Sequence, residues 1–455
     1  MSSATDTKTP AESLFGLGPA EQARLCAGAP LDALASRSPR PRADAAPVSP
    51  RFTRFSELPD YKRLQVQRLV AEKTGIKNLF FTCHETRAQA RTRINGREFL
   101  NFATYDYLGL NGHPEVTAAA GEAMRVFGTS AGASRLVAGE RPQHAALEKA
   151  LAALYGAAAA VIFVSGHATN VSTLCTLLNA RDAVYHDALA HNSLVMGARF
   201  SGAARYAFPH NDRDALEDQL RRTRAGHERA LIVTEGLFGM DGSIADLPEL
   251  IALKRKYGCF LMVDEAHSLG TLGRTGRGVA EYFGADPADV DIWMGTLSKT
   301  LCGCGGFIAG CAELAELLRY GAPGFVYSVG MPPPMAAASA KALEIMLREP
   351  ERVAGLRRLS GFFLREAKER GLNTGHAVEG SAVIPLIAGN SLMAGYLSHL
   401  LFERGVNALP IVYPVVEEGM ARLRFFLSSE HAEADIVTAL DAVAEDLPVA
   451  VRKFQ

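Results

Sequence analysis

The chain has 455 residues, 48% of them hydrophobic, and its 48 basic and 49 acidic residues leave a formal net charge of −1. This length suffices for one large core and a smaller one, and the near-neutral charge gives no reason to expect nucleic acid or an anionic membrane as partner. Seven cysteines without regular spacing indicate a reducing compartment. Because no apolar run reaches the roughly eighteen residues of a membrane span and no secretory signal is present, we expect a cytoplasmic protein without a membrane span.

Residues 1–52 differ in composition from the rest and predict a flexible extension. Residues 30–50 are rich in Ala, Pro, Arg and Ser without periodicity, which is typical of a linker. Residues 11–15 and 19–25 are compatible with a short helix ahead of it. A helix followed by a linker suits docking to a larger assembly, and the alternative is a tail without a role.

Residues 53–110 form an N-terminal segment with local signals of its own. The pattern over residues 59–74 predicts a helix that stops at Gly75. Residues 78–81 and 98–102 are predicted as strands on either side of an Asn95-Gly96 turn, a hairpin signal. A helix over residues 114–127 and a loop of small residues, 128–135, follow.

Between residues 143 and 310 helical and strand patterns alternate, which predicts an α/β fold with a mostly parallel sheet covered on both faces. We expect residues 111–332 to form a large domain and residues 333–455 a smaller α+β domain. A long helical stretch should run from Pro334 to about Gly371. The helices are predicted at residues 144–155, 169–178, 193–201, 212–224 and 247–257. The strands are predicted at residues 160–164, 183–185, 205–208, 230–234, 260–263, 291–294 and 306–309.

Two of these strands deliver chemically useful side chains at their ends. Asp264 follows the strand at 260–263, with His267 three residues later, and Lys299 follows the strand at 291–294 after a short polar turn. In a parallel sheet ligands lie beyond the carboxyl ends of the strands. A desolvated lysine forms imines readily, and an aspartate can keep a pyridinium nitrogen protonated. The pair therefore predicts pyridoxal phosphate (PLP) as cofactor.

Several stretches stand in a recognisable order. They are SGHATN at 165–170, TEGLFGMDG at 234–242, VDEAH at 263–267, GTLSK at 295–299, GRTGRG at 273–278, YSVGMPP at 327–333 and ARLR at 421–424. Together they resemble the α-oxoamine synthases over about residues 55–450. The resemblance implies a fold type I PLP-dependent transferase, homodimeric, with active sites at the subunit interface.

The family's reaction condenses a small amino acid with an acyl thioester, releasing carbon dioxide and leaving an α-amino ketone. Alanine, glycine or serine would be the amino acid, and CoA or an acyl carrier protein would carry the acyl group. The sequence leaves the amino acid, the carrier and the acyl chain length open. Two alternatives are an ordinary aminotransferase and a catalytically inactive regulatory subunit, although loss of the lysine would be expected in the latter.

The resemblance also implies roles for four catalytic residues. Lys299 would carry the cofactor and act as acid and base at the substrate α-carbon. Asp264 would pair with the pyridinium nitrogen, and His267 would lie near the phenolic oxygen of the cofactor. His191 matches the histidine that stacks on the cofactor ring.

Further residues would bind the cofactor and the substrate, and no metal ligand is expected. The cofactor phosphate should lie at the helix start after Gly166 and His167, because free N–H groups there favour an anion. Thr296 would add a hydroxyl, and Ser328 would reach the phosphate from the neighbouring subunit. Arg424 matches the arginine that holds the substrate carboxylate.

Three positions depart from the family pattern. Gly239 stands where many members have a serine that hydrogen-bonds the phenolic oxygen, so this contact is missing or supplied otherwise. His167 replaces an aromatic residue, which preserves a backbone role. Tyr105 stands where several members have asparagine, and this position near the substrate leaves the amino acid in doubt.

Overall fold

The computed structural model describes residues 49–454. Of the extension predicted over residues 1–52, the first 48 positions lie outside the described residues. The chain divides into two compact units, Met1–Val70 and Ala71–Gln455. The described part of the first unit holds two short 3-10 helices, Pro50–Phe52 and Phe55–Glu57, and most of helix α2 (Pro59–Thr74). Its proline start and the positive φ of Gly75 confirm the helix predicted at 59–74.

The Asn95-Gly96 turn connects strand β1 (Arg91–Ile94) to strand β2 (Arg97–Asn101). Both turn residues have positive φ, 50° and 74°, as a two-residue hairpin of type I′ requires. The strand predicted at 78–81 is wrong, because this segment forms a turn in which Phe81 has a φ of 61°. The true partner strand reads Arg-Thr-Arg-Ile, and the exposed arginines hide its apolar alternation.

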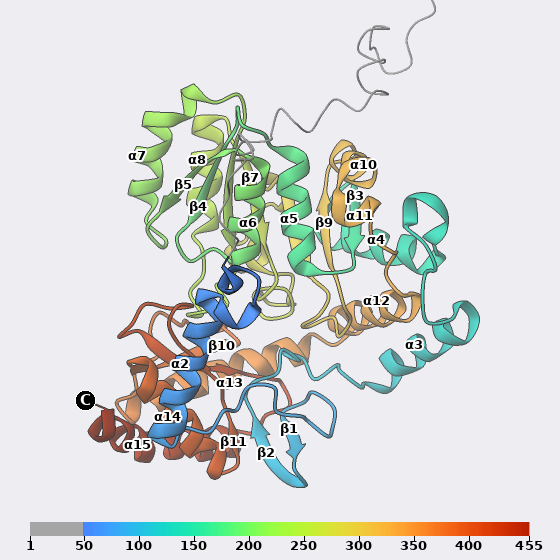
Figure 1. Cartoon of the computed structure of the whole chain (residues 1–455). Helices are drawn as coiled ribbons and strands as arrows, with labels where there is room; N and C mark the ends of the chain where they lie inside the picture. Colours follow the sequence, from blue (N-terminus) through green and yellow to red (C-terminus); the bar gives the residue numbers. More distant parts are fainter. Residues whose placement is uncertain (1–48, 455) are drawn as a thin grey trace, which may run out of the picture. The chain divides into compact units, whose positions relative to one another are not determined.

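The central sheet has seven strands in the order β3-β9-β8-β7-β6-β4-β5. Figure 1 labels β3, β9, β7, β4 and β5 of this sheet. Only β9 runs antiparallel to its neighbours, so the predicted, mostly parallel sheet is confirmed. Every strand predicted between residues 160 and 309 is present within two residues at each end. The strands are β3 (Ala159–Phe163), β4 (Ala183–Asp187), β5 (Ala204–Phe208), β6 (Ala230–Glu235), β7 (Phe260–Asp264), β8 (Ile292–Thr296) and β9 (Gly306–Gly310).

Alternate side chains of each strand enter two separate cores, one on each face of the sheet. On β6, for example, Ile232 packs into one core and Val233 into the other. Helices α5 (Gly166–Leu177), α6 (Asn192–Ser201) and α10 (Ala312–Gly321) contribute to the second core. Helices α4 (Pro142–Leu154), α7 (Arg213–Thr223) and α8 (Leu247–Tyr257) contribute to the first. Layers on both faces give the three-layer α/β arrangement that the sequence predicts.

The chain after residue 332 departs from prediction in its helices. The helical stretch predicted up to about Gly371 is present but is interrupted at Glu349, because Pro350 cannot donate a helical hydrogen bond. Two helices result, α12 (Pro333–Arg348) and α13 (Pro350–Glu369). The remaining elements are β10 (Val383–Gly389), α14 (Ser391–Glu403), β11 (Val406–Asn407), β12 (Pro410–Ile411), β13 (Ala421–Phe426) and α15 (Glu433–Phe454). Strands β10, β13 and β12 form one small sheet, and β1, β2 and β11 another.

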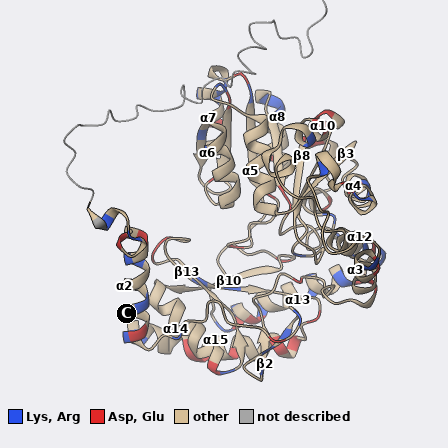
Figure 2. Ribbon diagram, turned by 45° about the vertical axis from the view of Figure 1, so that its right-hand side comes forward, with Lys and Arg blue, Asp and Glu red and all other residues tan. Residues whose placement is uncertain are grey.

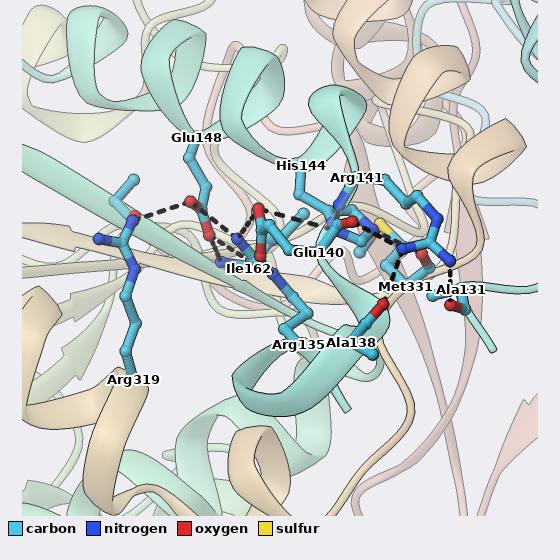
Figure 3. A network of polar contacts seen from close by, with 11 residues as sticks. Ala131, Arg135, Ala138, Glu140, Arg141, His144, Glu148, Ile162, Arg319 and Met331 are labelled. Atoms are coloured by element: carbon cyan, nitrogen blue, oxygen red, sulfur yellow. Dashed lines mark hydrogen bonds and ion pairs between the residues drawn. The ribbon is translucent and has the colours of Figure 1, made fainter. Parts of the chain in front are cut away.

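A buried ion network fixes the segment before α4 (Figure 3). The segment forms a π-helix, Arg135–Gly139. Arg135 donates to both Glu140 (Nε to Oε2, 2.6 Å) and Glu148 (Nη1 to Oε1, 2.5 Å). Glu148 also accepts from Arg319 of α10 (2.8 Å) and from the backbone N–H of Ile162 on β3 (2.9 Å). One carboxylate thus ties the π-helix to the sheet and to α10.

Charges of both signs are interspersed on the outer helices (Figure 2). On α7, for example, Asp218 pairs with both Arg221 and Arg222. Helix α3 (Pro114–Phe127), confirmed at its predicted bounds, carries a similar pair of Glu122 and Arg125. Among residues 49–454, no helix is both long and apolar enough to cross a bilayer.

Candidate active site

Four strands of the central sheet end beside one another with polar residues. Strands β6, β7 and β8 are parallel neighbours and end at Glu235, Asp264 and Thr296. Lys299 follows β8 by three residues, and His191 follows β4 by four. Since the carboxyl ends of parallel strands share one edge, these side chains converge there. The charge of Asp264 acts on both Lys299 and His191, so the structure brings these three predicted residues together.

Asp264 is buried and held by two donors. Asn170 of α5 donates from Nδ2 to Oδ2 (2.8 Å), and the backbone N–H of Ala266 donates to Oδ1 (2.9 Å). Asn170 also donates to the hydroxyl of Ser193 at the start of α6 (2.9 Å). Two helices therefore fix the position of this carboxylate. Asn170 is a site residue that sequence reasoning missed, although it stands in the quoted SGHATN stretch.

The environment of Lys299 makes its amine reactive. Desolvation, with a smaller contribution from the charge of Arg424, lowers the pKa of Lys299 to about 8, against the opposing charges of Asp264 and Glu235. The Lys299 Nζ lies 5.4 Å from the centre of the Tyr105 ring. Both residues line a cavity of about 440 Å³, together with Ser298 and Cys302. An amine with this pKa is largely available as a nucleophile slightly above neutral pH.

Glu235 is a second residue that sequence reasoning missed. It lies opposite Asp264 in the β6–β7 register and accepts hydrogen bonds from the backbone N–H groups of His191 (2.8 Å) and Gly239 (3.3 Å). Burial, and then the neighbouring charge of Asp264, raises the pKa of Glu235 to about 8. A carboxylate at the end of an apolar strand was the signal that could have revealed it.

The start of α5 and the turn after β8 form an anion cradle. Ser165 caps α5, and a Cβ atom added to Gly166 would lie 2.9 Å from Thr296 Oγ1. Only glycine therefore lets the helix start approach this hydroxyl, which also hydrogen-bonds the hydroxyl of Ser298 (2.8 Å). His167 is exposed beside the cradle, with its ring centre 6.4 Å from that of His191. Free N–H groups and two hydroxyls suit a phosphate.

His191 caps α6 and accepts at Nδ1 from the hydroxyl or the N–H of Ser193 (2.7 and 3.3 Å). Its pKa is lowered, first by desolvation and then by the charge of Lys299, which favours the neutral imidazole. His191 therefore starts a helix and lies within the electrostatic reach of the lysine. Only Nδ1 takes part in capping α6, so the face of the imidazole ring remains available for a role at the cofactor.

Arg424 lies on β13, which is far in sequence from the strands that position the other site residues. Its Nη1 donates to the carbonyl of Gly239 (2.8 Å), and its guanidinium lies over the ring of Phe426 at 4.5 Å. The Nε is buried and has no hydrogen-bond partner among the described residues. A fixed guanidinium with a free buried donor is suited to a carboxylate ligand.

Ser328 is the one predicted site residue that the structure does not place with the others. Within residues 49–454 its hydroxyl hydrogen-bonds only the carbonyl of Val329 (3.3 Å). Two hydrogen bonds connect the loop around Ser328 to the residues that precede the π-helix. The backbone N–H of Gly330 donates to the carbonyl of Ala133, and the hydroxyl of Ser134 donates to the carbonyl of Val326. The predicted contact of Ser328 with a neighbouring subunit stays a prediction.

Comparison with known proteins agrees with this geometry. Residues 97–443 match the family of class I and II aminotransferases. The chain is 39% identical over 381 residues to 8-amino-7-oxononanoate synthase of Symbiobacterium thermophilum, covering 83% of this chain and 96% of that protein. The serine palmitoyltransferase of Sphingomonas wittichii has a TM-score of 0.82 and 30% identity over 87% of this chain and 99% of its own. A serine palmitoyltransferase of S. paucimobilis with bound PLP–myriocin also has a TM-score of 0.82, at 27% identity, and the match covers 86% of this chain and 98% of that one.

The chain belongs to the α-oxoamine synthase family. The predicted resemblance, the fold type I assignment and the activity of a PLP-dependent acyltransferase are thereby confirmed. The cofactor of this α-oxoamine synthase is PLP. The residues fit it, because the site offers a low-pKa amine, a fixed carboxylate and an anion cradle within one sheet edge.

The lowered pKa of Lys299 predicts how the apoprotein takes up PLP. Only the neutral amine attacks an aldehyde, so the uptake rate should rise with pH and level off above about 8, instead of rising toward 10.5. Stopped-flow absorbance of the apoprotein mixed with PLP between pH 6 and 10 measures this midpoint. Asp264→Asn should move the midpoint to lower pH, because the carboxylate raises the pKa of Lys299. A midpoint near 10 in the unchanged protein would contradict the desolvated amine.

Proposed function

We propose that this α-oxoamine synthase joins a small amino acid, which is alanine, glycine or serine, to an acyl thioester on CoA or an acyl carrier protein. The products are an α-amino ketone, carbon dioxide and the free thiol. The observation that carries the proposal is the convergence of the Lys299 amine, the fixed Asp264 carboxylate and the free donor of Arg424. These groups serve the three needs of the reaction, which are a base, an electron sink and a carboxylate anchor.

PLP, when bound, takes up the negative charge that develops at the substrate α-carbon. Asp264 favours a protonated pyridine nitrogen, because two donors hold its carboxylate as a fixed partner for that cation. The helix start at Gly166 with Thr296 and Ser298 would hold the phosphate, and His191, as a neutral imidazole, would stack on the cofactor ring.

Lys299 moves protons at the α-carbon of the substrate. It removes the α-proton before the new carbon–carbon bond forms to the acyl carbonyl, and the thiolate leaves from that carbonyl. The carboxylate of the amino acid then leaves as carbon dioxide, and Lys299 returns a proton to the α-carbon. A pKa of about 8 suits both directions of transfer near neutral pH.

The amino acid is limited in size by Tyr105. Its ring packs edge-on against Phe426 (4.7 Å between centres) and stands 5.4 Å from the Lys299 amine, so it narrows the space beside the reacting carbon. A small side chain suits this space.

The direct test of the proposed function is an absorbance spectrum of the holoprotein with glycine, alanine and serine added separately, followed by a measurement of thiol release from acyl-CoA. A shift with one amino acid and thiol release only in its presence is expected.

The same experiment separates the competing functions. An aminotransferase would form a keto acid from the amino acid without consuming a thioester. An inactive subunit would bind no PLP or would release no thiol with any of the three amino acids. The lysine, the aspartate and the anion cradle argue against an inactive subunit. The similarity to 8-amino-7-oxononanoate synthase and to serine palmitoyltransferase favours the condensing enzyme over an aminotransferase.

Arg424→Lys is expected to raise the KM for the amino acid about 10- to 100-fold while leaving the KM for the acyl thioester unchanged. Lysine keeps the charge but loses the planar fork, and a charge-assisted hydrogen bond contributes about 1.5–3 kcal/mol. Steady-state kinetics with each substrate varied in turn measures the split. Arg422→Lys is the matched control, because Arg422 lies on the same strand and binds the carbonyls of Met240 and Met420. Equal effects of both variants would show that Arg424 has only a structural role.

We further propose a homodimer with the active sites at its interface. Apolar side chains around the Ser328 loop and the π-helix are exposed, and a partner surface would cover them. They are Leu136, Val137, Tyr327 and Val329.

Analytical ultracentrifugation should give the mass of two chains for the unchanged protein. Val137→Glu should weaken this association, because it places a charge among the apolar side chains. A substitution at Val66, which is also exposed, should leave the association unchanged.

A further inference from the structure

Tyr107 and His267 form a buried pair behind the site. The Tyr107 hydroxyl lies 2.7 Å from His267 Nδ1, and both side chains are almost fully enclosed, Tyr107 at 0% and His267 at 7% exposure. Tyr107 comes from the loop after β2 and His267 from the turn after β7, so the contact joins segments 160 residues apart. It is the only hydrogen bond of either side chain within residues 49–454.

The direction of this hydrogen bond follows from the chemistry of the two groups. Burial raises the pKa of Tyr107 well above its usual value and lowers that of His267 well below, so the pair is a neutral phenol and a neutral imidazole. The phenol proton has no acceptor among the described residues other than Nδ1. Tyr107 therefore donates, Nδ1 accepts, and the single imidazole proton lies on Nε2.

The glycine at position 239 makes room for the His267 ring. A Cβ atom added to Gly239 would lie 2.2 Å from His267 Nε2 and 2.6 Å from Cδ2, far inside van der Waals contact. A side chain at position 239 and this ring position are therefore mutually exclusive. The Nε2–H has no hydrogen-bond partner among residues 49–454, and His267 lies within the electrostatic reach of Lys299, Arg424 and His191.

We propose that Tyr107 is a positioning residue that fixes His267 as the Nε2–H tautomer, so that His267 supplies to the phenolic oxygen of PLP the donor that a hydroxyl at position 239 would otherwise give. The inference rests on the proposed place of His267 at the cofactor. It also explains the glycine at 239, because the ring that replaces the missing hydroxyl occupies the room of its side chain.

Tyr107→Phe tests the tautomer directly in the apoprotein. Protein labelled with ¹⁵N-histidine should show His267 as the Nε2–H form, assigned by its absence in His267→Asn among 12 histidines. The phenylalanine variant removes only the hydroxyl and should shift the His267 nitrogens toward a mixture of tautomers. An Nδ1–H form in the unchanged protein would overturn the proposal. This readout needs neither cofactor nor activity.

The holoprotein gives the second readout. A donor to the phenolic oxygen stabilises the deprotonated form of the bound cofactor, so weakening it should raise the pH midpoint of the cofactor absorbance. For a neutral hydrogen bond the expected rise in Tyr107→Phe is about 0.5–1 pH unit. Lys299, Arg424, His191 and Tyr105, the other titratable groups facing this pair, are unchanged in the variant.

Tyr155→Phe is the matched control. Tyr155 is 2% exposed, its hydroxyl is buried without a partner among the described residues, and its ring stacks on Trp293 (5.0 Å). Removing this hydroxyl should leave the midpoint unchanged, which excludes a general effect of losing a buried phenol. A shift of equal size in both variants, or none in Tyr107→Phe, would overturn the proposal.

Gly239→Ala is a second way to disturb the Nε2–H donor of His267. Gly239 does not have positive φ, so alanine is acceptable to the backbone and the added methyl acts only by displacing the His267 ring. The pH midpoint of the cofactor absorbance should rise in Gly239→Ala, as it should in Tyr107→Phe. Melting curves show whether the variant is folded. If the unchanged holoprotein shows no cofactor absorbance at all, the proposed function fails, whereas the tautomer measured in the apoprotein still decides the role of Tyr107.

Discussion

Lys299→Ala is expected to abolish turnover, by at least about 10⁴-fold, while the protein stays folded. The change removes the buried amine that would bond to the cofactor and move the proton at the α-carbon, so both tasks are lost together. The protein should lose nothing in stability, because a desolvated amine with a pKa lowered to about 8 is costly to bury in its charged form. Thiol release from acyl-CoA and thermal melting measure the two effects.

Lys256→Ala serves as the control for this result. Lys256 lies on the exposed end of α8, paired with Glu217, and its loss should change neither turnover nor the cofactor absorbance. Residual turnover of the Lys299 variant within tenfold of the unchanged protein would refute the proposed mechanism. A variant that melts far below the unchanged protein would instead assign Lys299 a structural role.

Asp264→Asn should lower turnover by roughly 10²–10³-fold, the order of loss seen when one preorganised electrostatic partner is removed. Asparagine has the same shape, but it carries no charge to hold a protonated pyridine nitrogen. Its amide can accept only one of the two hydrogen bonds that Asn170 and Ala266 now donate. The absorbance of bound PLP and the turnover rate should therefore change together.

Asp291→Asn provides a comparison on a neighbouring strand. Asp291 precedes β8 at its other end, accepts from the N–H of Leu261 (2.7 Å) and pairs with Lys254 (2.8 Å). The same chemical change there should lower the melting temperature without altering turnover per folded molecule. If Asp264→Asn kept full turnover, the aspartate would be a structural partner of Asn170 only.

Local signals in the sequence were enough to predict most elements of the sheet and its covering helices. Helix α8 matches its prediction because Asp246 caps its start and Gly258, with φ of 62°, ends it. The strand ends that carry Asp264 and Lys299 were predictable because apolar runs stop there. Helix α14 was missed because its sequence, SLMAGYLSHLLFE, is apolar on nearly all sides and shows little helical periodicity.

The site was predictable only where one segment carries its own signal. Lys299 and Asp264 follow predicted strands and could be inferred from the residues themselves, whereas His191 and Arg424 were assigned from the resemblance. The contacts of Glu235 with the N–H group of His191, and of Tyr107 with His267, join segments 44 and 160 residues apart and leave no local pattern. The role of Ser328 was inferred from the resemblance alone. Its predicted contact is with the neighbouring subunit, and the structure of one chain does not contain that surface.

The bond between Arg424 and the carbonyl of Gly239 spans 185 residues, and the one between Tyr107 and His267 spans 160. The site is therefore not complete until residue 424 has been synthesised and β13 has joined its small sheet. On the proposed role of Arg424, a nascent chain that stops short of β13 lacks the group that would bind the substrate carboxylate. The amino-acid response of the cofactor colour should therefore report whether the last segment has folded into place.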